Sequence, residues 1–171
     1  PLAEWSETEK LAREKELVGF YVSGHPLDSH RDLVDLYAAH VNTSNLGERR
    51  DQKVSVACVV TEIGRRISRK DGSEWARLIF EDYHGTAMAL AFRDAWAKHR
   101  DELVPGAPVL LIGAVSGRER DEENPPLFLN EVVPLETVYE SGRVAICLEL
   151  ENGSEVDRAS LSEAVRIARA H

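Results

Sequence analysis

The amino-acid sequence predicts a mainly β chain of the α+β class, in which five strands form a small barrel with helices before and after it. Two observations predict this arrangement. Segments with helical spacing open the chain and return near its end, within residues 6–39 and 160–170. Between them lie alternating runs rich in β-branched residues, and a single helical segment interrupts these runs at residues 94–103.

Two helices are expected ahead of the barrel. Ser6 and Glu9 have the spacing of a capping box that opens the first helix. Gly24 is expected to supply its left-handed C-cap, because Pro26 prevents continuation. The inward residues of the first helix are expected to be Leu11, Leu17, Val18 and Tyr21. Those of the second helix, at residues 29–39, are expected to be Leu33, Val34, Leu36 and Tyr37.

The first two strands are predicted to form a hairpin. The first spans residues 53–68 and bends or bulges near Gly64. Asp71-Gly72 predicts the turn, because tight hairpin turns need positive φ angles. The inner face of the first strand is expected to hold Val54, Val56, Cys58 and Val60. The returning strand, residues 75–81, is expected to direct Ala76, Leu78 and Phe80 inward and Trp75, Arg77 and Ile79 outward.

The third strand is predicted over residues 86–92. We expect its bulky residues Met88, Leu90 and Phe92 to face the core, so that the alternate alanines form a small outer face. The helix at residues 94–103 follows, with Ala95, Trp96, His99 and Leu103 on its inner stripe. Strands at residues 109–115 and 127–138 complete the set. Three strands, a helix and two more strands is the element order of an OB-fold, although a generic five-stranded barrel without nucleic-acid function has the same order.

A further strand and helix are predicted after the barrel, at residues 143–150 and 160–170. They are too small to form a core of their own, so we interpret them as the start of a domain that has been cut. The start at Pro1 also indicates a fragment of a longer protein. The predicted division is a helical segment at 1–45, an OB-fold domain at 46–140 and the beginning of a C-terminal domain at 141–171.

Composition excludes several classes of protein. The chain has 171 residues, of which 43% are hydrophobic and 30% charged, and no apolar run approaches the length of a membrane span. The first residues do not form a signal peptide. Cys58 and Cys147 each lie in an apolar run and are interpreted as buried, reduced thiols, which favours a cytoplasmic protein.

The net charge of −9 argues against a surface that binds nucleic acid everywhere. Residues 49–72, however, contain seven Lys and Arg residues against three acidic ones, a local charge of +4. Acidic residues are concentrated elsewhere, at 119–123 and from Glu131 onward. This asymmetry permits a local contact with nucleic acid.

Residues for catalysis are not found. The six histidines are scattered without metal-ligand spacing, and neither a phosphate-binding glycine loop nor a nucleophile with its base is present. His25 is interpreted as a helix-end or packing residue, His84 as part of a turn, and Asp32 and Asp35 as a solvated helix face. We therefore predict no enzymatic activity for this chain alone.

Two runs of residues carry a family resemblance. Residues 14–28, EKELVGFYVSGHPLD, are similar to a signature of the bacterial DNA polymerase III alpha subunit, which in that family immediately precedes the OB-fold. Residues 56–82 resemble the OB segment of the same family and, more loosely, anticodon-binding-type modules. The Ser-Gly-His-Pro-Leu form at 23–27 is more similar to the replicative enzyme than to its error-prone paralogue.

The resemblance implies a parent that is a DNA-directed DNA polymerase, a nucleotidyltransferase using palm carboxylates and Mg²⁺. The palm motifs and the histidine-rich metal domain of that family do not occur in this sequence, so no cofactor is expected in it. The implied partners are single-stranded template DNA and, through neighbouring regions of the parent, the sliding clamp and the tau subunit of the clamp loader. The implied location is the bacterial cytoplasm, at the nucleoid. Gln52 is the only glutamine and does not begin a clamp-binding motif.

OB-folds bind single strands on the face of strands two and three, where phosphates need cations and bases need flat side chains. The candidate nucleic-acid-binding residues are Arg65, Arg66, Arg69, Lys70, Trp75 and Arg77. Because few outward aromatic residues are expected, binding is predicted to be weak and sensitive to salt. The alternative for this region is a charged, soluble hairpin with Trp75 packed on the preceding helices.

Two other functions stay open at this point. The chain can be a protein-docking or architectural module of the replisome that does not bind DNA by itself, using the acidic loop at 119–123 or the leading helices. It can also be an RNA-binding module akin to anticodon-binding domains.

Overall fold

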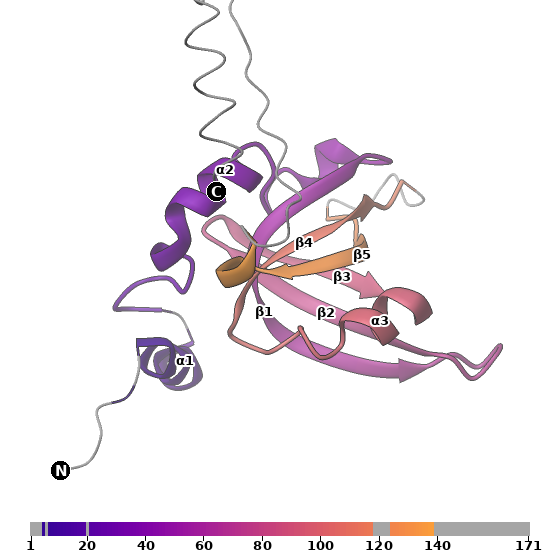
Figure 1. The fold of residues 1–171 in the computed structure, drawn as a ribbon, viewed down its shortest axis with the longest axis horizontal. Coiled ribbons are helices and arrows are strands. Elements are labelled where there is room, and N and C mark those ends of the chain that lie inside the picture. Colours follow the sequence, from indigo (N-terminus) through magenta and orange to yellow (C-terminus); the bar gives the residue numbers. More distant parts are fainter. Residues whose placement is uncertain (1–4, 6, 20, 118–123, 139–171) are drawn as a thin grey trace, which may run out of the picture.

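The computed structural model describes residues 5, 7–19, 21–117 and 124–138 (Figure 1). Its centre is a closed barrel with the strand order β1-β2-β3-β5-β4. The strands are β1 (Lys53–Ile67), β2 (Glu74–Asp82), β3 (Gly85–Ala91), β4 (Pro108–Val115) and β5 (Leu127–Pro134). Strands β3 and β5 pair in parallel, whereas the other neighbours are antiparallel. Helix α3 (Arg93–His99) lies between β3 and β4 in the chain. This is the topology of an OB-fold, so the predicted fold class is confirmed.

Strand β1 is long because it pairs with two neighbours in succession. Its first half pairs with β4 and its second half with β2, and Val59 has a partner on both sides. The register shifts between Val60 and Glu62, where the strand changes partners. The predicted bulge therefore occurs in this strand but a few residues before Gly64, which itself pairs regularly with Arg77.

The interior of the barrel combines large residues on most strands with small ones on β3. Phe80 and Leu78 of β2 are fully buried, and their cross-strand partners on β3 are Ala87 and Ala89. Each large side chain thus fills the space that the alanine opposite leaves free. The expectation that Met88, Leu90 and Phe92 face the core is therefore wrong. Met88 and Leu90 are only partly buried, and Phe92 is 49% exposed.

Two further expectations about the strands and helices need correction. Strand β5 ends at Pro134 and passes into a 3₁₀ turn (Leu135–Thr137), so it is shorter than predicted, because proline offers no N–H to continue a ladder. Helix α1 (Glu7–Val18) ends just before Gly19, not near Gly24. Gly19 has a φ of +88° and its N–H donates to the carbonyl of Lys15 at 3.0 Å, which is a C-cap geometry.

The leading helices bury fewer apolar residues than their spacing predicts. In α1, Leu11 is buried, but Leu17 is 82% exposed and Val18 is 51% exposed. Helix α2 (Arg31–Ala38), which a 3₁₀ turn (Asp28–His30) precedes, buries Leu33 but leaves Leu36 56% exposed. The expected inward positions of Leu17, Val18 and Leu36 are thus wrong. In each helix, the apolar residues that are buried lie on a narrow stripe, because the rest of the helix has no other element to pack against.

A second apolar cluster attaches the leading segment, which we define as residues 21–45, to the outside of the barrel. Leu27 is fully buried in this cluster, and Val34 and Tyr37 of α2 pack against it. The barrel contributes outward residues of β1, β4 and β5 and of the segment after β5, namely Ala57, Val59, Leu110, Val133, Leu135 and Val138. Figure 1 shows α2 on one side of the barrel, whereas α3 and the tip of the β1–β2 hairpin lie on the other.

Polar contacts complete this attachment at the turn between β2 and β3. The Tyr83 hydroxyl donates to the Asp28 carboxylate at 3.0 Å, and the His25 ring centroid lies 4.7 Å from that of Tyr83. The Thr43 N–H and hydroxyl both donate to Asp82, at 2.7 and 2.6 Å. The Ser-Gly-His-Pro-Leu residues therefore anchor the leading segment to the barrel, which agrees with the interpretation of His25 as a packing residue.

His25 gives this anchor a pH dependence. Burial lowers the pKa of the His25 imidazole and Lys15 adds to this effect, whereas the carboxylates of Glu81, Asp28 and Asp82 oppose it. The folded pKa therefore lies below the unfolded value of about 6.5, and the unfolded state binds more protons as the pH falls. The contribution of His25 to the free energy of unfolding is complete above about pH 6.5 and is lost progressively below it.

We expect His25→Asn to weaken this pH dependence, because Asn keeps an acceptor for the Leu27 N–H, which donates to His25 Nδ1 at 3.2 Å, but does not titrate. The measurement is denaturant unfolding at about pH 7.5 and about pH 5.5. The wild-type chain should lose more stability between the two conditions than the variant. Asp28, whose pKa is also lowered, titrates below this window. An equal loss in both proteins would contradict the prediction.

Several expectations concern residues outside the described ranges: the strand and helix at 143–150 and 160–170, Cys147, and the acidic loop at 119–123. The domain boundaries at 45/46 and 140/141 stay predictions. Cys58, as expected, is buried and free. Within the described ranges, none of the helices combines the length and the apolar character required to cross a membrane.

Candidate nucleic-acid interface

The outer face of β2 and β3 carries the candidate site. Residues directly opposite each other in antiparallel strands share a face of the sheet. Arg66 lies opposite Trp75, and Arg77 lies opposite Leu90. Because Ala76 and Leu78, which alternate with them along β2, are fully buried, Trp75 and Arg77 point away from the core, as predicted. Arg66 and Arg77 are exposed, and Trp75 is half-buried.

Three aromatic side chains run side by side across this face. The ring centroids of Trp75 and Phe92 are 6.0 Å apart, and those of Phe92 and Phe128 are 5.8 Å apart. Phe128 reaches this position because β5 pairs with β3 and places it opposite Leu90. We call Trp75, Phe92 and Phe128 the aromatic strip. The ring contact of Trp75 is thus with Phe92, the residue just after β3, and not with the preceding helices.

Sequence reasoning missed Phe92 and Phe128, for different reasons. The period-two alternation of residues 127–129, Leu-Phe-Leu, predicts that Phe128 points outward once both leucines are assigned to the core. For Phe92 no such signal exists, since residues 87–92 alternate alanine with larger apolar side chains and neither face is polar. Only the size of the residues opposite them on β2 decides which set is buried.

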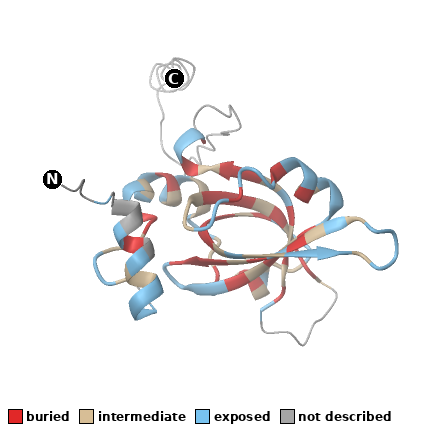
Figure 2. Cartoon of the chain, turned by 90° about the horizontal axis from the view of Figure 1, so that it is seen from below, coloured by how far each residue is buried: buried red, intermediate tan, exposed pale blue. Residues whose placement is uncertain are grey.

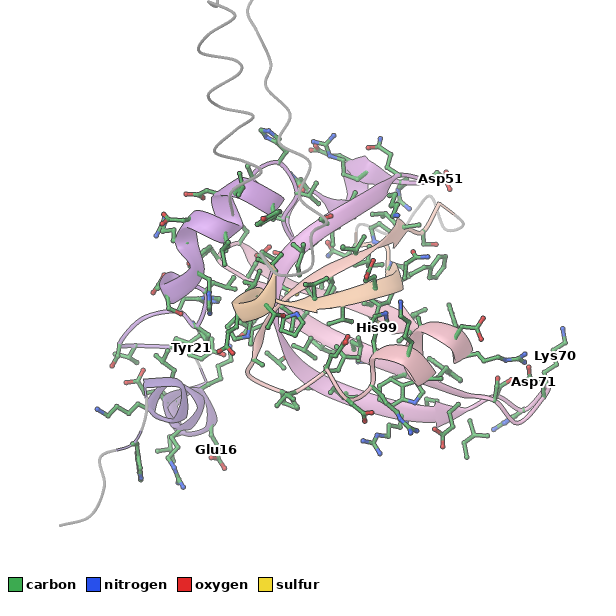
Figure 3. All side chains as sticks on the ribbon, viewed as in Figure 1. Glu16, Tyr21, Asp51, Lys70, Asp71 and His99 are labelled. Carbon is green, nitrogen blue, oxygen red and sulfur yellow. The ribbon has the colours of Figure 1, made fainter. Side chains whose placement is uncertain are left out.

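The turn of the β1–β2 hairpin projects beyond the barrel. Its exposed tip is visible in Figure 2, and Figure 3 shows Lys70 and Asp71 at its far end. Gly72 adopts a φ of +71°, as the Asp-Gly sequence predicts. The Asp71 carboxylate accepts hydrogen bonds from the N–H of Ser73 at 3.1 Å and from its hydroxyl at 2.7 Å. These bonds hold the pKa of Asp71 well below its usual range.

Five of the six predicted binding residues lie at the tip of this hairpin or on the outer face: Arg66, Arg69, Lys70, Trp75 and Arg77. Arg65 differs from them. It lies opposite the buried Ala76, and its guanidinium carbon is 5.6 Å from the ring centroid of Trp96 in α3. Arg65 therefore covers the end of the barrel instead of extending the outer face.

The charges of this region are mixed. Arg69 and Lys70 are exposed at the tip. Asp71, in the turn that joins the two strands, forms an ion pair with Arg93, the first residue of α3. Glu62 and Glu74 are exposed nearby on β1 and β2. In the described part of the chain, no cluster of three or more His, Cys, Asp and Glu residues is arranged to hold a metal ion.

Comparison with known proteins places the chain in context. No protein-family model matches it. The DNA polymerase III subunit alpha of Treponema pallidum is 33% identical over 166 residues, or 95% of this chain. That of Saccharopolyspora erythraea is 28% identical over 174 residues, covering 98% of this chain. The chain is homologous to one segment of DNA polymerase III alpha subunits. It spans only 13% and 14% of the length of these two relatives.

The family resemblance predicted from residues 14–28 and 56–82 is thereby confirmed. Among solved structures, the second OB-fold domain of replication protein A from Methanococcus maripaludis is 15% identical, with a TM-score of 0.39, over 51% of this chain and 87% of that one. Asparaginyl-tRNA synthetase from Pyrococcus horikoshii is 16% identical, with a TM-score of 0.39, over 78% of this chain and 28% of that one. The strand order of the barrel, not these distant likenesses, identifies the fold of this polymerase III alpha segment.

Proposed function

We propose that this chain is the non-catalytic OB-fold region of a replicative DNA polymerase III alpha subunit, and that it binds single-stranded template DNA weakly during chromosomal replication. The observation that carries the proposal is the aromatic strip beside the cations of the β1–β2 hairpin. Nucleotide addition and its Mg²⁺ ions belong to other regions of the parent enzyme, which acts in the cytoplasm with the sliding clamp and the clamp-loader subunit tau.

Aromatic and charged side chains make different contributions to the binding of single-stranded DNA. Stacking of a base on an aromatic ring contributes about 1–3 kcal/mol and is tolerant of sequence, because every base has a π-face. Arg66, Arg69, Lys70 and Arg77 supply positive charge for the phosphates. The chain as a whole carries −9, so attraction is confined to this face and the affinity is low. Tethering to a polymerase that already holds the template makes a weak site effective.

A docking role is the second candidate, and exposed apolar residues of the N-terminal region favour it. Leu17 is 82% exposed, Val18 is 51% exposed and Val22 is 64% exposed. They lie on or just after α1, which Figure 1 shows on the side of the barrel away from α3. A module that positions other parts of the replisome would use this surface and would not need independent DNA binding.

The test is fluorescence anisotropy of a labelled single-stranded oligonucleotide at low and moderate salt. We expect wild-type binding to weaken as salt rises, and the variant Arg65→Ala/Arg66→Ala/Arg69→Ala/Lys70→Ala to lose most of it. Each phosphate contact removed should lower the slope of log K against log salt by about 0.7. The variant Arg69→Ala/Lys70→Ala should lose more affinity than Arg50→Ala/Lys53→Ala, which removes the same charge near the opposite end of β1.

Equal losses in the two double variants would assign binding to overall charge and contradict a site on the hairpin. Undetectable binding of the folded wild-type chain at low salt would exclude independent DNA binding and favour docking. A clear preference for a folded RNA over single-stranded DNA would favour the RNA-binding alternative.

A further inference from the structure

One ion pair crosses the candidate interface between elements distant in the chain. The Arg93 guanidinium contacts the carboxylate of Asp71, which lies 22 residues earlier on the hairpin. Arg93 directly follows Phe92 of the aromatic strip, and Asp71 directly follows Lys70 at the tip. The pair therefore joins the end of the strip to the hairpin that carries the cations.

The contact can open at low cost. The two side chains are 61% and 38% exposed, and ion pairs in such positions contribute only about 0.2–1 kcal/mol. Asp71 also does not depend on Arg93 for its orientation. Its Oδ1 accepts both hydrogen bonds from Ser73, whereas its Oδ2 contacts Arg93. The carboxylate thus keeps its place in the turn when the guanidinium leaves.

We propose that Arg93 is a phosphate-binding residue of this interface, and that the Asp71 carboxylate occupies its guanidinium in the free chain. A guanidinium binds the paired oxygens of a carboxylate or a phosphate with the same geometry, so one ligand replaces the other directly. A strand that stacks on Phe92 carries its backbone past the adjacent Arg93. The proposal rests on the proposed function and adds a residue that pattern and charge clustering did not select.

Exchange of one anion for another makes Asp71 a competitor of the DNA. Asp71→Asn should therefore raise the affinity for a single-stranded oligonucleotide about 1.4- to 5-fold, because the ion pair no longer has to be broken when DNA binds. Asn keeps the Oδ1 acceptor for Ser73, so the turn is retained. The matched control is Glu74→Gln, which removes one negative charge from the same hairpin. Within the described ranges Glu74 has no ion-pair partner.

A double-mutant cycle separates competition from a general change of charge. We expect Arg93→Gln to weaken binding and to lower the salt slope by about 0.7. In the Arg93→Gln background, Asp71→Asn should raise affinity no more than Glu74→Gln does. Anisotropy titrations at two salt concentrations give all of these values, and thermal unfolding confirms that each variant is folded.

The outcomes distinguish this proposal from the proposed function. If the wild-type chain binds, and Arg93→Gln leaves both the affinity and the salt slope unchanged, the role of Arg93 is overturned while DNA binding stands. Equal gains for Asp71→Asn and Glu74→Gln in the wild-type background overturn the competition. If neither the wild-type chain nor Asp71→Asn binds at low salt, the proposed function and this inference both fall.

Discussion

Leu27→Ala is expected to lower the free energy of unfolding by about 2–5 kcal/mol, as other fully buried leucines do when truncated. Leu27 has no exposed surface and lies in the apolar cluster between the leading segment and the outside of the barrel. Its removal leaves a cavity in a cluster that includes Ala57, Val59 and Leu110, which are held by strand pairing and cannot move to close it. Denaturant unfolding measures the change.

The control for this prediction is Val22→Ala. Val22 lies five positions away in the same segment but is 64% exposed, so we expect a change within about 0.5 kcal/mol. Oligonucleotide affinity of the folded Leu27→Ala chain should stay unchanged, because Leu27 and the aromatic strip contact different faces of the barrel. A small loss of stability would show that the leading segment is not anchored as described.

Trp75→Ala and Phe92→Ala are each expected to weaken single-stranded DNA binding by about 1–3 kcal/mol, or roughly 5- to 150-fold, through the loss of a stacked base. Unlike the loss of a cation, this effect should leave the salt slope nearly unchanged, since counterion release depends on phosphate contacts. Anisotropy titrations over a range of salt concentrations measure both quantities. Trp75→Phe should retain more affinity than Trp75→Ala, because it keeps a ring.

Ile79→Ala is the matched control for the aromatic variants. Ile79 lies on the same outer face of β2 and is apolar, but it has no ring on which a base can stack. If Ile79→Ala weakens binding as much as Trp75→Ala does, the face acts through apolar contact in general, and the aromatic strip has no special role. Unchanged affinity in Phe92→Ala would limit the site to Trp75 and the hairpin.

The orientation of β3 decides how many aromatic rings lie on the outer face, and it therefore changes the affinity expected for single-stranded DNA. A featureless outer face of alanines would leave Trp75 as an isolated ring. With Phe92 and Phe128 beside it, the face offers three rings in a row. The cations of the hairpin then supply the salt-dependent part of the affinity and the strip supplies a part that salt does not screen.

The sequence alone determined the features that depend on local spacing and local chemistry. The alternation of Ala76, Leu78 and Phe80 with Trp75 and Arg77 predicts both faces of β2, because side chains of a strand alternate strictly. Asp71-Gly72 predicts the turn, since Gly72 tolerates a positive φ. The signature at residues 14–28 predicts the family, which comparison confirms.

Tertiary structure decided the features that depend on what lies opposite a residue. Ala87 and Ala89 are buried because Phe80 and Leu78 fill the space across from them, and Phe92 is consequently turned outward. Leu17 and Leu36 have helical spacing but no surface to contact, so they stay exposed. The pair of Asp71 with Arg93 forms because antiparallel pairing places the end of β3, just before α3, beside the start of β2, just after the hairpin turn. Local pattern specifies which residues share a face, whereas the volumes and charges of distant neighbours specify which face is buried and which charges meet.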